Sequence, residues 1–151
     1  MDQHIFRDYD RINQLFKQYN HIYHKLAVNA DIADSVFDIY YALLWKDAPC
    51  TPTDITDFSG SSKQTIHSAL KKLEAEGEIL IEVSPENRRN RLVSLTDKGY
   101  AKAHASVQPV MDAEYRSFAS LTPEERETLI RIQTKQLAAF QNEAKKILSE
   151  K

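Results

Sequence analysis

The stretch SSKQTIHSALKKLEAEGEILIEVSPENRRNRLVSLTDKG, Ser61–Gly99, decides the fold of this chain. Its first part has apolar residues at helical spacing and reaches Gly77, a residue type that commonly follows a helix C-terminus. The segments EILIEVS and RLVSL then alternate like two strands around a basic tip. A short helix is expected before this stretch, because TPTDI at Thr51–Ile55 has a capping threonine, a proline and an acid in the right order. The order helix, tight turn, helix, hairpin predicts a winged helix-turn-helix.

A helical wheel divides the predicted helix Ser62–Glu76 into an apolar side, which must pack inward, and a polar side. From Gly60 to Leu73 the segment contains three lysines and no acid. Short polar side chains let a helix enter a major groove, where Gln and Ser can read base edges and Lys can contact phosphate. An ordinary solvent-exposed face would have the same pattern. The predicted DNA-binding residues of this helix are Ser62, Lys63, Gln64, Thr65, His67, Ser68, Lys71 and Lys72. Ser61 and Gln64 also have capping-box spacing, which would occupy Gln64.

The tip of the predicted hairpin is strongly basic, although the whole chain has a formal net charge of −2. That charge excludes a generally basic, histone-like protein but not a local DNA-binding surface. Neighbouring exposed arginines repel one another unless a polyanion meets them, and arginine inserts well into a narrow minor groove. We therefore predict DNA contacts for the wing residues Arg88, Arg89, Asn90 and Arg91. The alternative is a winged helix used for protein contact, with these arginines docking an acidic partner.

The two basic segments together resemble the MarR family of bacterial winged-helix regulators. ENRRNRLVSLTDKG is similar to that family's wing signature, an acid-x-Arg turn that leads into an apolar strand and Leu-Thr-x-x-Gly. Arg89 falls on the wing-tip arginine, Leu95, Thr96 and Gly99 match the closing motif, and Asn87 stands where the family usually has aspartate. The resemblance implies an obligate homodimer on a pseudo-palindromic double-stranded DNA operator, with repression relieved by a signal. Its two recognition helices would lie about one DNA turn apart, roughly 34 Å.

Long apolar stripes flank the winged region at both ends of the chain. The first thirty residues carry one stripe at alternating steps of four and three, and another follows LTPEER near the C-terminus, where Thr122 and Glu125 have capping-box spacing. Pro109 should bend the helix that begins after Thr96. We expect a mainly α (α+β) fold with long terminal dimerisation helices; a monomeric bundle is the alternative. The expected regions are residues 1–32 and 100–151 for dimerisation and residues 33–99 for DNA binding, within one continuous MarR-like domain 1–151.

Several residues could sense a signal. The resemblance implies a small aromatic or apolar effector between the dimer helices and the winged region. The candidate pocket residues are Tyr19, Tyr23, Tyr40, Tyr41, Trp45 and Tyr115, and ordinary packing aromatics are the alternative. His21, His24 and His104 lack acidic or cysteine ligands at metal spacing, so we expect no metal site. The position of Cys50 beside a helix start could lower the pKa of its thiol, as redox sensing would require.

The composition excludes other classes of protein. Cys50 is the only cysteine, so no intramolecular disulfide can form. Phosphate-binding loops, nucleophile elbows and zinc-protease motifs are missing from the sequence, and we expect neither an enzyme nor a cofactor. The first residues lack a signal-peptide layout, and no apolar run approaches the roughly 18 residues of a membrane-spanning helix. We therefore expect a soluble cytoplasmic protein with no membrane partner.

Overall fold

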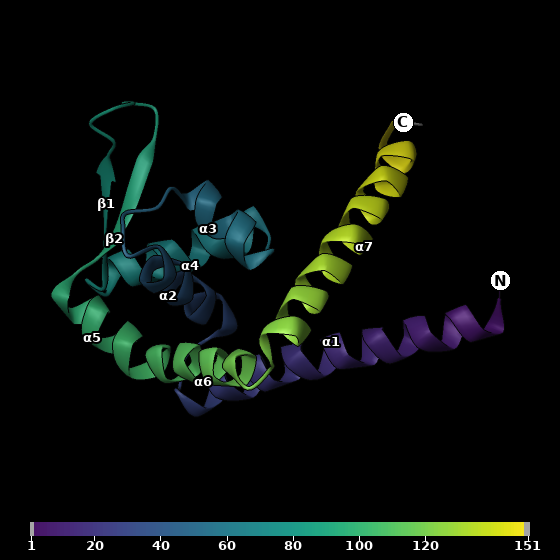
Figure 1. The fold of residues 1–151 in the computed structure, drawn as a ribbon. Helices are drawn as coiled ribbons and strands as arrows, with labels where there is room; N and C mark the ends of the chain where they lie inside the picture. Colours follow the sequence, from purple (N-terminus) through teal and green to yellow (C-terminus); the bar gives the residue numbers. More distant parts are fainter. Residues whose placement is uncertain (1, 150–151) are drawn as a thin grey trace. The chain divides into compact units, whose positions relative to one another are not determined.

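The structure is a computed structural model that describes residues 2–149. The described chain forms seven helices and a single two-stranded antiparallel sheet (Figure 1). The elements in chain order are α1 (Gln3–Asn29), α2 (Asp34–Lys46), α3 (Pro52–Ser59), α4 (Lys63–Ala75), β1 (Ile79–Val83), β2 (Arg91–Leu95), α5 (Asp97–Ser106), α6 (Gln108–Ala119) and α7 (Pro123–Ser149). The chain divides into two compact units, Met1–Val110 and Met111–Lys151. This architecture confirms the predicted mainly helical winged-helix fold with long terminal helices.

Side-chain caps set the first residue of most helices. Thr51 and Asp54 form a reciprocal capping box at the start of α3, and Thr122 and Glu125 form another before α7. The expected capping box of Ser61 and Gln64 is wrong. Ser62 is the cap of α4 instead, and its hydroxyl accepts a hydrogen bond from the Thr65 backbone N–H at 3.1 Å.

Two glycines turn the chain before and after α4. Gly60 and Gly77 both have φ of 68°, the left-handed region in which other residues are strained. Gly60 closes α3 and leads through the tight turn into α4, while Gly77 follows the last turn of α4 and leads into β1. Both helices of the helix-turn-helix, α3 and α4, therefore end beside the glycines that the sequence indicated.

The hairpin of β1 and β2 pairs in the register Ile79 with Leu95 and Val83 with Arg91. A third segment joins it, because both backbone groups of Val93 pair with Cys50 at N–O distances of 3.0 and 2.8 Å. Val93 and Cys50 are fully buried. The loop between α2 and α3 is therefore attached to the inner part of the wing.

The core of the first unit lies around α2, which contacts α3, α4 and α5. Apolar faces of these helices and of the hairpin meet there, and their buried side chains include Ile39, Ile55, Ile66, Leu70, Leu73, Ile79, Val93 and Val107. The inward stripe expected for α4 is confirmed, since Ile66, Leu70 and Leu73 are 1 to 2% exposed.

Pro109 divides the helix that follows Thr96 into two. The first piece, α5, ends at Ser106 and α6 begins at Gln108. Proline has no backbone N–H and is tolerated in a first helical turn, where that donor would have no intrahelical partner. The expected bend is thus a break between two helices.

Both terminal helices leave large apolar side chains exposed within their own units. Ala27 is the only buried residue of α1, and α7 has no buried residue among those described. The exposed apolar residues of α1 are Ile5, Phe6, Tyr9, Ile12, Leu15, Phe16, Tyr19, Ile22 and Val28. Those of α7 are Leu129, Ile130, Ile132, Leu137, Phe140, Ile147 and Leu148. None of the helices in residues 2–149 has the length and apolarity needed to cross a membrane.

Candidate nucleic-acid interface

The outward face of α4 is polar, basic and exposed. All eight residues predicted to bind DNA from this helix, including its cap Ser62, are exposed. Acidic side chains enter the helix only at Glu74, near its C-terminal end. This arrangement follows from the sequence, because the apolar residues at helical spacing fix which side faces the core. The face can approach a polyanion without repulsion over its first three turns.

The N-terminal turn of α4 is held by its own side chains. The Ser62 hydroxyl lies 2.8 Å from the Thr65 hydroxyl, so these two side chains form a hydrogen bond with each other. Ser61 is engaged elsewhere, because its hydroxyl donates to the Asp38 carboxylate at 3.0 Å. The Gln64 side chain has no hydrogen-bond partner within residues 2–149, so it is available to a ligand.

The lysines of α4 differ in their surroundings. Lys63 and Lys71 form no ion pair with any residue that the structure describes. Lys72 lies 3.9 Å from Glu76 in an exposed i,i+4 pair, with the lysine side chain 64% exposed. Exposed pairs of this kind contribute about 0 to 1 kcal/mol, so a phosphate can readily replace Glu76 as the partner of Lys72.

A groove runs between α3 and α4 on this exposed face. It has a volume of about 380 Å³ and is lined by Pro52, Thr53, Thr56, Lys63, Gln64, Ile66 and His67. Thr53 is exposed, whereas the Thr56 hydroxyl donates to the Pro52 carbonyl at 2.8 Å. Thr53 was not among the predicted contacts. The sequence contained the relevant signal, since the first helix of a helix-turn-helix crosses the DNA backbone beside the recognition helix.

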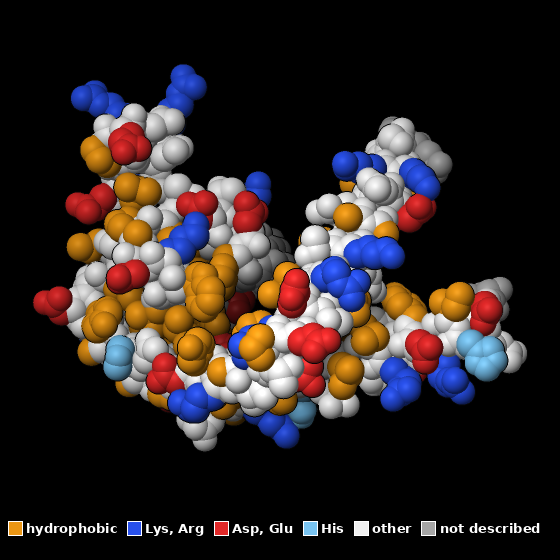
Figure 2. Space-filling view, viewed as in Figure 1, with side chains coloured by type: hydrophobic (Ala, Val, Ile, Leu, Met, Phe, Trp, Pro, Cys, Tyr) orange, Lys and Arg blue, Asp and Glu red, His pale blue; other side chains and the backbone are white. Residues whose placement is uncertain are grey.

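The wing tip presents its arginines to solvent. Arg88, Arg89 and Arg91 are exposed, and none pairs with a carboxylate within the described part of the chain. Figure 2 shows basic side chains projecting from the end of the hairpin, beyond the acidic groups of its stem. The arginines are therefore not neutralised by neighbouring carboxylates.

Asn87 organises the turn that carries these arginines. Its side-chain oxygen accepts a hydrogen bond from the Arg89 N–H at 3.0 Å, and its carbonyl accepts from the Asn90 N–H at 2.8 Å. An asparagine at this position fixes the backbone as an aspartate would, but adds no negative charge. The basic charge of the tip is thus undiminished.

The six predicted pocket aromatics lie in different surroundings. Tyr40 is buried, and its hydroxyl donates to the Glu78 carboxylate. Burial, reinforced by Glu78, raises the pKa of the Tyr40 hydroxyl far above its usual value. Tyr23, Tyr41 and Trp45 belong to one chain of ring contacts through Phe37, with centroid separations of 6.0 to 6.3 Å. Tyr19 is 59% exposed, and Tyr115, in the second unit, is 75% exposed.

Two of the other candidate sensing residues, His24 and Cys50, have structural roles in the described chain. His24 pairs with Asp34 at 2.9 Å, and no cluster of three or more metal-ligating side chains occurs between residues 2 and 149. Cys50 is buried, and burial raises the pKa of its thiol. The structure thus excludes the alternative that the position of Cys50 lowers this pKa, and a protonated, enclosed thiol is a poor redox sensor.

Comparison with known proteins adds to this geometry. Residues 29–79 match a family described as winged helix-turn-helix DNA-binding. A search of curated protein sequences finds no match. Solved structures with the same fold include a MarR family regulator from Neisseria meningitidis, at 23% identity over 99% of each chain and a TM-score of 0.73.

Two further solved structures are similar over most of their length. A MarR family transcriptional regulator from Silicibacter pomeroyi is 26% identical over 85% of this chain and 86% of its own, with a TM-score of 0.65. BpsR from Bordetella bronchiseptica is 19% identical over 84% of this chain and 90% of its own, with a TM-score of 0.61. The DNA binding of BpsR is described as regulated by 6-hydroxynicotinic acid.

Proposed function

Since this chain is a winged helix-turn-helix protein with the fold of the MarR family regulators, we propose that it is a homodimeric repressor that binds a pseudo-palindromic operator. In this proposal α4 enters the major groove and the wing inserts Arg89 into the adjacent minor groove. The observation that carries the proposal is the pair of exposed basic segments, the α4 face and the wing tip, whose arginines have no carboxylate partner in residues 2–149.

The α4 face supports sequence reading as well as charge attraction. Gln64, His67 and Ser68 are exposed hydrogen-bonding side chains on the helix that would lie in the groove. Lys63, Lys71 and Lys72 surround them and would contact phosphate, which increases affinity without selecting a sequence. Thr53 lines the groove beside Lys63 and would add a further backbone contact.

The exposed apolar faces of α1 and α7 support the proposed dimer. A monomer rarely leaves so many large apolar residues in water, and faces of this kind commonly mark subunit interfaces. A second copy is the natural partner, because a palindromic operator requires two-fold symmetry in the protein. Residues 1–32 and 100–151 would form this dimerisation region, and residues 33–99 would bind DNA. Such a repressor would act in the cytoplasm.

A small aromatic or apolar effector would release the operator. The aromatic chain of Tyr23, Tyr41 and Trp45 supports this part of the proposal, because Trp45 is 63% exposed and offers a ring face. The small-molecule control described for BpsR, a structure of the same fold, is consistent with it. Tyr40 is a less suitable ligand contact, since its hydroxyl is taken by Glu78.

Selection of bound duplexes from a random DNA pool tests the proposal. We expect enrichment of an inverted repeat whose half-site centres are about one helical turn apart. The mass of the protein–DNA complex in sedimentation should correspond to two chains per duplex. Absence of enrichment contradicts the proposal, and tight binding of an acidic protein instead would favour the winged helix as a protein-contact module.

A further inference from the structure

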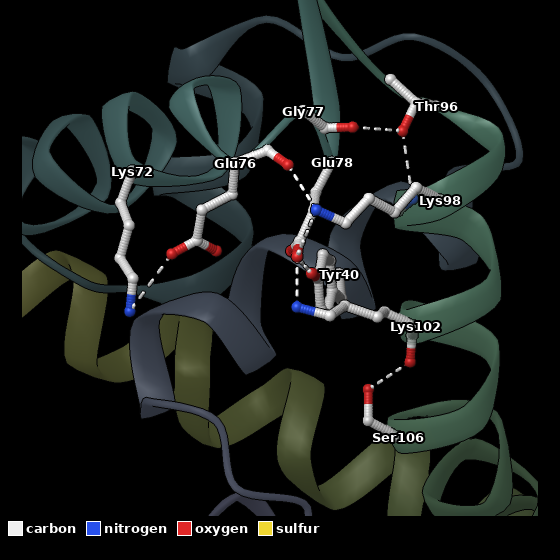
Figure 3. A network of polar contacts seen from close by, with 10 residues as sticks. Tyr40, Lys72, Glu76, Gly77, Glu78, Thr96, Lys98, Lys102 and Ser106 are labelled. Carbon is white, nitrogen blue, oxygen red and sulfur yellow. Dashed lines mark hydrogen bonds and ion pairs between the residues drawn. The ribbon is translucent and has the colours of Figure 1, made fainter.

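A buried carboxylate lies between the two DNA-reading segments. Glu78 is 1% exposed and stands between the end of α4 and the start of β1. Its Oε2 accepts a hydrogen bond from the Tyr40 hydroxyl of α2, and its Oε1 accepts one from Lys102 of α5. Lys98, also on α5, lies 3.8 Å from the same Oε1 (Figure 3). Glu78 thus joins three elements that are distant in sequence.

The backbone around Glu78 is held by α5 as well. Thr96, the cap of α5, donates its hydroxyl to the Gly77 carbonyl at 2.8 Å and its N–H to the Glu78 carbonyl at 3.1 Å. Lys98 donates to the Glu76 carbonyl. Gly99 packs so closely on Glu78 that any Cβ at this position would collide with the Glu78 carbonyl oxygen. We call Glu78, Tyr40, Lys98 and Lys102 the Glu78 hub.

The charges in the Glu78 hub are unequally exposed. Lys98 and Lys102 are 58% and 54% exposed, so water can solvate either ammonium group if Glu78 loses its charge. The carboxylate has no such alternative, and a buried charge without its partner is costly. The geometry therefore favours the arrangement in which α2 and α5 keep their contacts with Glu78 at the α4–β1 junction.

The position of this junction has a consequence for DNA binding. The recognition helix ends three residues before Glu78, and the wing begins one residue after it. Any change of angle between α4 and the hairpin must pass through residues 76–78, which are the ones that α5 holds. The α4 helix, the wing and the first turn of α5 are therefore connected through these three residues.

We propose that Glu78 is a positioning residue that fixes the spacing between the recognition helix and the wing through Tyr40, Lys98 and Lys102. The proposal rests on the proposed DNA-binding function and concerns how that function is made specific. Because an operator must meet both segments at once, a loose junction would weaken operator binding more than binding to random duplex DNA. The Glu78 hub contacts no DNA itself.

Substitutions that remove one contact at a time test this role. Glu78→Gln keeps the shape and removes the charge, Tyr40→Phe removes one donor, and Lys102→Met removes one cation. Lys102→Arg keeps a cationic donor and should restore wild-type behaviour. Glu82→Gln is the matched control, because Glu82 is an exposed glutamate of β1 with no ion pair in the described chain.

Fluorescence anisotropy with operator and with random duplex gives the readout. We expect Glu78→Gln to lower operator affinity about tenfold, the size of one lost charged hydrogen bond. Random-duplex affinity and the salt dependence should stay unchanged, because every lysine and arginine remains. The double variant Glu78→Gln, Lys102→Met should bind the operator no more weakly than the single variant with the lower operator affinity, since the two groups act as one unit.

Hydrogen exchange of backbone amides separates failure of this inference from failure of the proposed function. Glu78→Gln should accelerate exchange in β1, β2 and the last turn of α4, while Glu82→Gln should not. If Glu78→Gln matches Glu82→Gln in operator affinity, or if its exchange is unchanged, the positioning role is refuted. If the wild type selects no operator but exchange accelerates as expected, the Glu78 hub stands and the proposed function fails. Tyr40→Phe gives the same comparison should Glu78→Gln fail to fold.

Discussion

Arg89 has a fixed backbone and an unpaired guanidinium group, because Asn87 holds its N–H while no carboxylate in residues 2–149 meets its side chain. We expect Arg89→Ala to lower operator affinity about tenfold and to reduce the slope of log affinity against log salt by about one. Titrations at several salt concentrations measure both quantities. Arg7→Ala removes an exposed arginine of α1 outside the winged region and is the control, provided that sedimentation shows it to be as dimeric as the wild type. An unchanged salt slope for Arg89→Ala would argue against minor-groove insertion.

Glu78 predicts a pH dependence of stability. Burial alone would raise the pKa of its carboxyl, but hydrogen bonds from Lys102 and Tyr40 and the nearby Lys98 hold it below the ordinary value near 4.5. A carboxyl with a lowered folded-state pKa contributes stability above the unfolded-state pKa and loses it as pH falls through the folded-state value.

At alkaline pH the relevant group of the Glu78 hub is Lys102. Its hydrogen bond to Glu78, with nearby Glu76 adding to the effect, raises the pKa of Lys102 above 10.5. That contribution is present below pH 10.5 and is lost as pH rises through the raised value. Because the folded-state pKa of Glu78 is lowered, denaturant unfolding should show that the wild type loses stability below about pH 4.5 more steeply than Glu78→Gln does. Parallel curves would mean that the pKa of Glu78 does not change on folding, contrary to the lowered folded-state value.

At the scale of single elements, caps and turns allowed the sequence to predict the helix boundaries well. Thr51, Thr96 and Thr122 begin their helices where expected, since capping depends only on residues within one turn. Ser62 and Ser61 show where local reasoning fails. Both serines have the chemistry of a cap, and a tertiary contact with Asp38, 23 residues away, engages Ser61. The Glu78 hub was not predicted for the same reason, because Glu78 in EILIEVS has the sequence pattern of an ordinary strand acid.

The glycines of the α4–β1–α5 region provide an element-scale prediction. Gly77→Ala meets no neighbouring atom but strains a residue at φ of 68°, which should cost about 1 kcal/mol of unfolding free energy. Gly99→Ala forces α5 away from the Glu78 carbonyl and should cost roughly 1–3 kcal/mol or more, as overpacking does. Urea unfolding of both variants measures the difference. Equal losses would show that α5 moves off the Glu78 carbonyl at no greater cost than the backbone strain at position 77.

At the scale of the whole molecule, the exposed stripe of α7 should control assembly. Phe140 is 69% exposed, and Phe140→Glu would place a charge on the apolar face and should convert the proposed dimer into monomers. Asn142→Glu adds the same charge on the opposite face of α7 and should leave the dimer intact. Sedimentation velocity at micromolar concentration distinguishes the two. Identical behaviour of both variants would mean that α7 does not mediate assembly.

The backbone pairing of Cys50 with Val93 also bears on aggregation of the protein through its strand edges. A two-stranded ribbon has two unprotected edges, and each is a template on which a foreign strand can nucleate a fibril. Here the loop segment occupies the outer side of β2 at its centre, leaving β1 as the more open edge, and that edge carries the charge of Glu82. The wing can therefore remain exposed, as the proposed DNA binding requires, without its strands pairing with those of another molecule.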